Sequence, residues 1–169
     1  AHLKDYLRDN GYFRSQIDTI LTFSADGRYV DISIRLTENK RSMIDTIKVL
    51  GLDNVPQNVV HDIHQSLTLK AGDPYVKKSV IEAQSGILRT LMNAGYPKVF
   101  LDTLALMRYA STNNVSIMFK FNPGDRYMFG DIGFDHRDMD IDSIVMLRQL
   151  DFSSGDVFSE EKRQVSEQN

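Results

Sequence analysis

Residues 89–132 read RTLMNAGYPKVFLDTLALMRYASTNNVSIMFKFNPGDRYMFGDI, and most of this stretch has already occurred once, in residues 5–47. The segment Leu7–Tyr12 (LRDNGY) returns as Leu91–Tyr96 (LMNAGY), with glycine and tyrosine in the same places. Alternating apolar residues then match at an offset longer by one: Val30, Ile32, Ile34 and Leu36 align with Val115, Ile117, Phe119 and Phe121. Chance similarity does not explain why glycine, aromatic and apolar positions all keep register, so we interpret the match as an internal repeat.

A third, weaker copy gives the order of the elements within one repeat. Leu69–Tyr75 (LKAGDPY) corresponds to Phe152–Phe158 (FSSGDVF), at nearly the same offset. One unit then reads strand, helix, helix, strand, strand, which is an α+β order. We expect residues 40–124 to hold one complete unit, residues 1–39 the C-terminal half of a preceding unit, and residues 125–169 the N-terminal half of a following unit.

The composition is that of an ordinary globular chain, because 41% of the 169 residues are hydrophobic and 25% are charged. A formal net charge of −3, without a block of lysine or arginine, argues against a nucleic-acid partner. The absence of cysteine excludes disulfides and thiolate metal sites. No apolar run approaches the roughly 20 residues that a membrane-spanning helix needs. We therefore expect a chain that does not itself span a membrane.

The first part of the chain predicts a helix followed by a β-hairpin. Leu3–Asn10 reads as the end of an amphipathic helix that Gly11 closes, because glycine readily adopts the left-handed backbone found after helices. Strands are expected over Gln16–Phe23 and Tyr29–Thr37, joined around Asp26-Gly27, a strong hairpin signal. The alternation along the second strand predicts that its apolar residues face a core: Val30, Ile32, Ile34 and Leu36.

The rest of the chain follows the order of the repeat. Strands are expected over Met43–Leu50, Val99–Tyr109, Asn114–Phe121 and Tyr127–Phe134. Helices are expected after Pro56, over Lys77–Ala94, around Ile144–Leu150, and after Ser159, which can cap the last of them. The residues expected to shape turns and helix ends are Gly11, Tyr12, Gly72, Gly95, Tyr96, Gly124 and Gly155.

The order of elements and the recurring turn residues resemble those of POTRA domains, the polypeptide-transport-associated repeats of BamA-type and TamA-type outer-membrane assembly factors. The resemblance rests on Gly-Tyr after the second helix of the unit, on a glycine and a later aromatic after the first helix (residues 72–75 and 155–158), and on PGDRYMFGDI at residues 123–132. It covers essentially the whole chain. The sequence departs from the pattern at Glu38-Asn39-Lys40, where the first turn lacks a glycine.

The resemblance implies tandem α+β units, each with a three-stranded mixed sheet covered on one face by two antiparallel helices. It also implies a non-enzymatic chain without a cofactor, located at the periplasmic face of the bacterial outer membrane and followed in the parent protein by an outer-membrane barrel. The partners that it implies are unfolded outer-membrane or secreted client proteins, together with accessory lipoproteins or chaperones.

The strand after the second helix lies at the edge of such a sheet, which makes it the candidate client-binding site. An edge strand offers unpaired backbone donors and acceptors to an extended client, which binds as an added strand with little demand on its side chains. The residues of this strand that we expect at the client-binding edge are Val99, Leu101, Thr103, Ala105, Met107 and Tyr109. In the first unit the corresponding strand is Gln16–Phe23.

Two other functions fit the same sequence. One is the POTRA region of a two-partner secretion transporter, and the other is a periplasmic structural or cell-division module that docks one fixed partner. An enzyme is not expected, because the sequence shows no nucleophile-with-base pattern and no phosphate-binding glycine loop.

Two groups of polar residues superficially resemble metal sites. His61 and His64 have no further ligand at a familiar spacing, so a solvated helix face is favoured over a metal site. Asp138, Asp140 and Asp142 open like a calcium loop, but the glycine and the glutamate that such a loop needs are missing. Helix capping is the favoured role for these aspartates, and no metal is expected.

The two ends of the chain supply complementary halves of a unit. Residues 1–37 lack a first strand and a first helix, whereas residues 127–169 provide those elements but lack the hairpin. A half unit cannot bury its apolar strand faces alone, since even a whole unit of this size is only marginally covered. The terminal halves are therefore expected to be either frayed or paired between molecules, head to tail.

Overall fold

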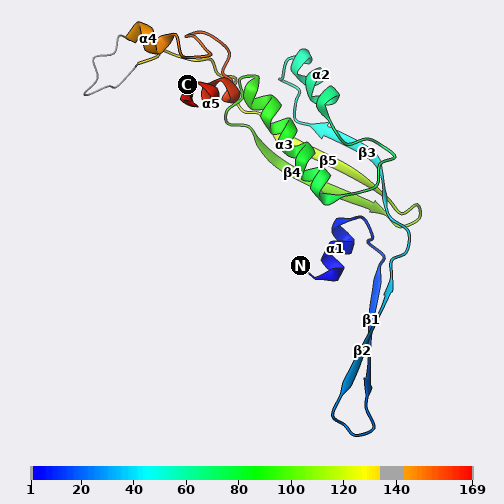
Figure 1. The fold of residues 1–169 in the computed structure, drawn as a ribbon. Coiled ribbons are helices and arrows are strands. Elements are labelled where there is room, and N and C mark those ends of the chain that lie inside the picture. Colours follow the sequence, from blue (N-terminus) through cyan, green and yellow to red (C-terminus); the bar gives the residue numbers. More distant parts are fainter. Residues whose placement is uncertain (1, 134–142, 169) are drawn as a thin grey trace. The chain divides into compact units, whose positions relative to one another are not determined.

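A computed structural model gives the structure of residues 2–133 and 143–168. Its elements are α1 (Leu3–Asp9), β1 (Gln16–Phe23), β2 (Val30–Thr37), β3 (Met43–Leu50), α2 (Gln57–Ser66), α3 (Lys77–Asn93), β4 (Phe100–Tyr109), β5 (Asn114–Asn122), α4 (Ser143–Leu147) and α5 (Glu160–Gln168) (Figure 1). β1 and β2 form a two-stranded sheet, and a three-stranded sheet has the order β3-β5-β4. The predicted α+β order of the repeat is therefore confirmed.

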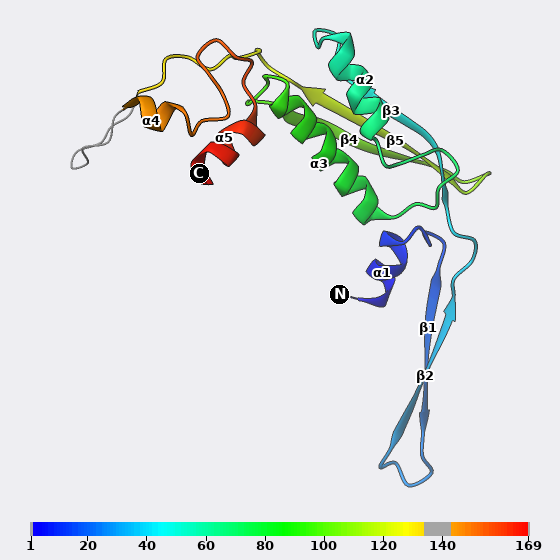
Figure 2. The ribbon, with the colours of Figure 1, turned by 45° about the horizontal axis from the view of Figure 1, so that its top comes forward.

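Figures 1 and 2 show α2 and α3 over one face of the three-stranded sheet. The chain forms two compact units, of which the first contains residues 1–47, 69–82 and 105–117, and the second residues 48–68, 83–104 and 118–169. The limits predicted for the sequence repeats, at residues 40 and 125, stay a prediction.

The core of the first unit is built from apolar residues of β3, α3 and β5. Ile44 of β3 is 1% exposed, and Val115 and Ile117 of β5 are 0% and 1% exposed. Val80 of α3 and Tyr75, which precedes this helix, are also buried. Burying one such aliphatic side chain stabilises the fold by roughly 1.5–3 kcal/mol relative to leaving it exposed.

The core of the second unit joins helical residues one turn apart to the aromatic end of β5. Val59 and Ile63 lie on the same face of α2, and Ile87 and Leu91 on the same face of α3, because residues four apart are neighbours on a helix. All four are buried, as is Phe119 of β5. The spacing of these residues is that of an amphipathic helix, and both helices lie where the sequence predicts them.

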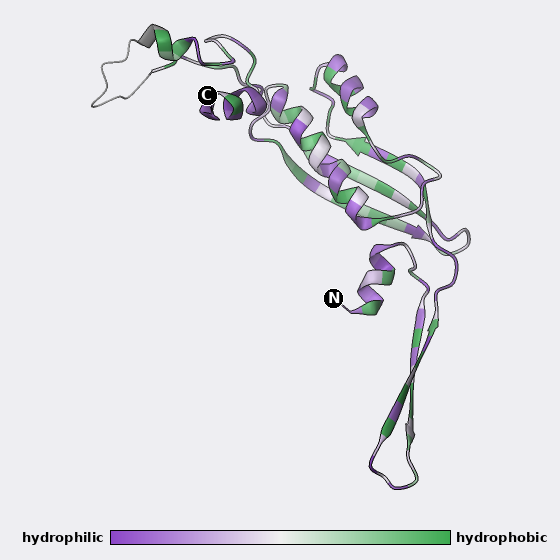
Figure 3. Ribbon diagram, in the orientation of Figure 1, coloured by the Kyte–Doolittle hydropathy of each residue, from purple (hydrophilic) through white to green (hydrophobic). Residues whose placement is uncertain are grey.

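The β1–β2 hairpin has the predicted strands but not the predicted burial. The strands pair antiparallel, from Gln16 opposite Thr37 to Phe23 opposite Val30, and Figure 3 shows hydrophobic and hydrophilic residues alternating along them. The prediction that the apolar residues of β2 face a core is wrong. Their exposed fractions are 47%, 64%, 63% and 38% for Val30, Ile32, Ile34 and Leu36.

The physical reason is found by comparison with the equivalent residues of the complete repeat, residues 40–124. Their counterparts in the repeat are Val115, Ile117, Phe119 and Phe121, and none is more than 2% exposed. In the three-stranded sheet β5 is paired on both sides, whereas β1 and β2 pair only with each other. Alternation therefore predicted the right face of β2, but burial needs a covering layer as well.

The predicted strand Tyr127–Phe134 is wrong over its described part. Met128 forms an isolated β-bridge with Val157, and residues 129–133 belong to no strand. An extended segment becomes a strand only when a neighbouring strand pairs with its backbone, as β5 does for β3. Phe134 lies outside the described residues, as do Asp138, Asp140 and Asp142.

The last helix begins where the sequence predicts it. α5 follows Ser159, whose Oγ accepts a hydrogen bond from the Lys162 N–H at 3.3 Å. A hydrogen bond from Arg163 holds the pKa of the Glu160 carboxyl below its ordinary value. A negative charge in the first turn also interacts favourably with the helix dipole, so capping and charge together fix this helix start.

The first junction between repeat copies is a small network in the first unit. The Ser42 N–H donates to the Gly11 carbonyl at 2.9 Å, and the Tyr75 N–H donates to the Ser42 carbonyl at 2.9 Å. Arg41 Nε donates to the Asn10 carbonyl at 2.8 Å. These bonds tie the end of α1 to the segment before β3 and to the loop before α3.

The second junction, in the second unit, repeats the same bonds. The Tyr127 N–H donates to the Gly95 carbonyl at 2.7 Å, and the Phe158 N–H donates to the Tyr127 carbonyl at 3.1 Å. Arg126 Nε donates to the Ala94 carbonyl at 3.1 Å. Each of these residues is the one that the sequence repeat pairs with its equivalent in the first junction. Residues that the sequence repeat pairs thus make equivalent hydrogen bonds at the two junctions.

The turn that departs from the family pattern keeps its geometry by another means. Gly124 in the second turn has a φ of +68°, and Asn39, its counterpart in the first turn, has a φ of +61°. Asparagine tolerates this left-handed backbone better than other residues with a Cβ. Its Nδ2 also donates to the Arg14 carbonyl at 2.8 Å, so the side chain anchors the turn.

Candidate functional site

β4 lies at an edge of the three-stranded sheet, with β5 as its neighbour. The strand begins at Phe100, so Val99 directly precedes it, and the other predicted residues lie within it. One side of β4 pairs with no strand of the described chain, which leaves backbone N–H and C=O groups on that side free to pair with an extended peptide. The binding of a client there stays a prediction.

The two faces of β4 can be told apart by one ion pair. Asp102 accepts a hydrogen bond from Lys120 of β5 at 2.8 Å, and Lys120 alternates along β5 with the buried Phe119 and Phe121. Asp102 therefore lies on the face opposite the core. The bond from Lys120 also lowers the pKa of the Asp102 carboxyl below its ordinary value.

The predicted residues alternate with Asp102, so they point to the core side of the sheet. Leu101 and Ala105 are half-buried, and Thr103 is exposed. Met107 and Tyr109 are 45% and 46% exposed even though they lie on this side. The edge position of β4 explains this exposure, because the core layer does not extend fully over the last strand.

The face opposite the core carries a second row of residues that the predicted set omits. Phe100, Leu104 and Leu106 are 52%, 37% and 41% exposed, and Arg108 is exposed at the end of the row. The signal was present in the sequence, because Leu104 and Leu106 break the polar alternation expected of a solvated face. An added strand would contact this row as well as the backbone of β4.

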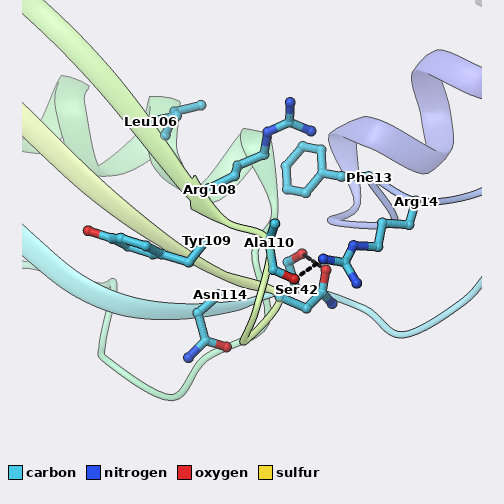
Figure 4. A pocket seen from close by; sticks show the side chains of 9 residues that line it. Phe13, Arg14, Ser42, Leu106, Arg108, Tyr109, Ala110 and Asn114 are labelled. Atoms are coloured by element: carbon cyan, nitrogen blue, oxygen red, sulfur yellow. Dashed lines mark hydrogen bonds between the residues drawn. The ribbon is translucent and has the colours of Figure 1, made fainter.

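A groove of about 460 Å³ lies in the first unit at the C-terminal end of β4. Its lining includes Leu106, Arg108 and Ala110 from β4 and the turn after it, and Phe13 and Arg14 from the loop after α1. Figure 4 shows the guanidinium of Arg108 against the Phe13 ring and that of Arg14 pointing to Ala110. Residues far apart in the sequence thus meet at the end of the edge strand.

Each guanidinium in this groove is held by a contact. The Arg108 guanidinium carbon lies 4.9 Å from the centroid of the Phe13 ring, within the range of a cation–π interaction. Arg14 Nη2 donates a hydrogen bond to the Ala110 carbonyl. Ser42 also lines the groove, and its Oγ donates to Asn113 Oδ1 at 3.1 Å.

The predicted turn and cap residues occupy the junctions described above. Gly11, Gly72, Gly95, Gly124 and Gly155 all have a positive φ, between +68° and +103°. The N–H groups of Tyr12 and Tyr96 donate to the Leu7 and Leu91 carbonyls at 2.9 and 3.1 Å, bonds that close the helices preceding them. These residues shape the chain and do not line the edge of β4.

The histidines of α2 have a partner other than a metal. His61 Nε2 lies 2.8 Å from the side-chain nitrogen of Gln65, one turn further along the helix. Among residues 2–133 and 143–168, no three potential metal ligands come together. In the same part of the chain, none of the helices combines the length and the apolar character that crossing a membrane would take.

Similarity to known proteins is found in the structure of the chain and not in matches to its sequence. No protein-family model matches the sequence, and no curated protein matches it. The crystal structure of POTRA domains 3–5 of Haemophilus influenzae BamA is similar, with a TM-score of 0.59 and 14% sequence identity. The similarity covers 96% of this chain and 63% of the BamA chain, so this chain spans less than two thirds of that structure.

Two further structures match less closely. BamA from Haemophilus ducreyi lacking POTRA domains 1–3 matches with a TM-score of 0.46 at 18% identity, over 76% of this chain and 22% of that chain. The N-terminal domain of Omp85 from Thermosynechococcus elongatus matches with a TM-score of 0.44 at 14% identity, over 98% of this chain and 67% of that chain. The H. influenzae structure carries the argument at the level of fold: this chain has the fold of tandem POTRA domains.

Proposed function

We propose that the chain is part of the periplasmic POTRA region of an outer-membrane protein assembly or translocation factor, where it binds unfolded client polypeptides by strand addition. The fold supports the assignment to POTRA domains. The observation that carries the binding mode is the position of β4 at the edge of the sheet. A receptor for many clients benefits from this mode, because backbone pairing makes little demand on side-chain sequence.

The exposed row on β4 gives the added strand a second source of affinity. Phe100, Leu104 and Leu106 present apolar surface beside the free backbone. Burial of apolar area contributes roughly 25 cal/mol per Å², and it does not require a particular client sequence. We therefore expect weak binding of unrelated strand-forming peptides, without catalysis and without a cofactor. Accessory lipoproteins or chaperones are further partners that we expect.

The test uses the 169-residue chain and a panel of fluorescent strand-forming peptides whose sequences are unrelated to one another. Fluorescence anisotropy should show comparable, weak affinities across the panel. Each peptide is then N-methylated either on alternate residues or on every residue. Methylation of alternate residues should leave binding largely intact, because one edge of the peptide keeps its N–H groups, whereas methylation of every residue should abolish binding. Tight binding of a single peptide would instead favour a docking module with one fixed partner, and retained binding of the fully methylated peptides would exclude strand addition.

The exposed hairpin face supports a second proposal, which is self-association. The apolar face of the β1–β2 hairpin is made by Ile17, Leu21, Phe23, Val30, Ile32, Ile34 and Leu36. Most of these residues are exposed, whereas the β5 counterparts of the four β2 residues are buried. A second copy could cover this face with its own C-terminal half unit, residues 125–169, in a head-to-tail arrangement.

Sedimentation velocity over a wide concentration range tests self-association. Ile32→Lys should abolish it, because Ile32 lies in the middle of the apolar face. Ile20→Lys is the matched control, since Ile20 is 44% exposed but pairs with Ser33 on the opposite face. A monomer at every concentration, with both ends of the chain resistant to proteolysis, would contradict this proposal.

A further inference from the structure

The two arginines of the groove at the end of β4 have no anionic partner in the described chain. None of the residues that line the groove is acidic. The ion pairs among the described residues involve other side chains, and neither Arg14 nor Arg108 takes part in one. The chain as a whole carries a formal net charge of −3. The groove differs from the rest of the chain, because its two guanidiniums give it a local positive charge.

Both guanidiniums are positioned before any ligand binds. Arg108 is stacked at 4.9 Å on the Phe13 ring, and Arg14 is bonded to the Ala110 carbonyl. Each of these contacts leaves most of the five N–H donors of the guanidinium free. An arginine held by stacking or by a backbone carbonyl loses less side-chain entropy when it binds a carboxylate than a fully solvated arginine does.

We infer that this groove binds a carboxylate side chain, aspartate or glutamate, carried by the extended peptide that adds to β4. This inference rests on the strand addition proposed above, because the groove lies where the edge strand ends. A peptide strand paired along β4 passes Leu106 and then Arg108. The aspartate or glutamate that binds the groove is therefore the peptide residue that lies beside this end of β4. The groove thereby sets the register of a peptide that backbone pairing alone leaves free to slide.

The probe is a set of neutral strand-forming peptides, amidated at the C-terminus, in which one glutamate is moved along the sequence and compared with glutamine at the same position. The glutamate peptide should bind roughly three- to tenfold more tightly than its glutamine partner at one position in the series. The advantage should shrink at high salt. Arg108→Gln and Arg14→Gln should each bring the ratio of the two affinities, glutamate peptide over glutamine peptide, toward one. The affinity of the glutamine peptides should not change.

Arg35→Gln is the matched control, because Arg35 is an exposed arginine of the hairpin and does not line the groove. It should leave the preference for glutamate unchanged. Circular dichroism melting of each variant checks that the fold is retained. A peptide with a free C-terminal carboxylate forms a separate arm, and an advantage found only there would overturn the assignment to a side chain.

The outcomes separate this inference from the proposed function. If glutamate and glutamine peptides bind equally at every position, the carboxylate site is wrong but strand addition stands. If the preference is present and survives both arginine substitutions, the groove is not its source and the inference is again wrong. If no peptide binds at all, the proposed function fails and the inference fails with it.

Discussion

Gly11 and Gly72 have nearly the same backbone conformation, with φ values of +88° and +91°, but different surroundings. A Cβ at Gly11 would lie 2.9 Å from the Tyr75 carbonyl oxygen, whereas a Cβ at Gly72 would meet nothing within 4 Å. The two positions therefore separate the cost of a left-handed backbone from the cost of a steric clash at the junction.

Gly72→Ala should lower the free energy of unfolding by about 1 kcal/mol, the cost of placing a residue with a Cβ in the left-handed region. Gly11→Ala should cost more, on the order of 3 kcal/mol, because the Ser42–Tyr75 network must also shift. Urea denaturation of the two variants provides the measurement. Equal losses would show that the close packing at the junction does not matter for stability.

A second prediction at this scale concerns pH. The hydrogen bond from Lys120 lowers the pKa of Asp102 in the folded chain. A group whose folded pKa is lowered stabilises the fold above its unfolded value, about 4 for aspartate, and this contribution is lost as the pH falls through the folded pKa. The pair is solvent-exposed, so the contribution to stability is small and is better seen in the pKa itself.

Lys120→Gln should raise the pKa of Asp102 toward its ordinary value. NMR titration of the carboxyl carbon gives this pKa directly, and Lys48→Gln, which removes a lysine that forms no ion pair with Asp102, is the control. An unchanged pKa in the Lys120 variant would mean that the ion pair does not form in solution.

At the scale of elements, β2 and β5 are two copies of one strand in different surroundings. Ile32 of β2 is 64% exposed, and Ile117 of β5, its counterpart in the repeat, is 1% exposed. The two isoleucines therefore form a matched pair, in which the residue type and the position in the strand are the same and the covering layer differs.

Ile117→Ala should destabilise the chain by about 2–5 kcal/mol, because it leaves a cavity in a packed core. Ile32→Ala should change stability by no more than about 0.5 kcal/mol. Chemical denaturation at low protein concentration, where self-association is absent, measures both. A large loss for Ile32→Ala under these conditions would show that the hairpin face is covered within a single molecule.

The edge strands β3 and β4 allow a similar comparison for binding. Leu104 of β4 and Leu50 of β3 are 37% and 42% exposed, and each lies on an outer strand of the three-stranded sheet. Leu104→Ser should weaken peptide binding several-fold through the loss of apolar contact, and Leu50→Ser should not. Anisotropy titration with one peptide of the panel decides the point, and a loss confined to Leu50→Ser would move the binding edge to β3.

For the whole molecule, the sequence predicted the repeat more accurately than it predicted burial. Residues that the repeat pairs make equivalent hydrogen bonds, because the junctions depend on local features that a sequence displays, such as Gly11 and Gly95 after their helices. Burial of the hairpin depends on a covering layer, and no pattern within β2 reports whether that layer is present. The same holds for residues 129–133, where strand formation needs a partner.

The groove at the end of β4 illustrates a different limit. Phe13, Arg14 and Arg108 meet there, although Arg108 lies far from the other two in the sequence. At the offset that pairs Gly11 with Gly95, Phe13 and Arg14 correspond to Pro97 and Lys98, so the repeat does not preserve them. Periodicity could predict the strand β4, and the family resemblance implied its edge position, but neither could predict a site that occurs in one copy of the repeat only.

The measurement that tests strand addition most directly is residue-resolved hydrogen exchange of the whole chain by NMR, with and without a saturating strand-forming peptide. The proposed function predicts that alternate amides of Phe100–Tyr109 gain protection, because only every second N–H of an edge strand points outward. The amides of β5 should change little, since both sides of that strand are already paired. Protection gained on α2 or α3 instead, with β4 unchanged, would contradict strand addition and would indicate a dedicated docking surface on the helices.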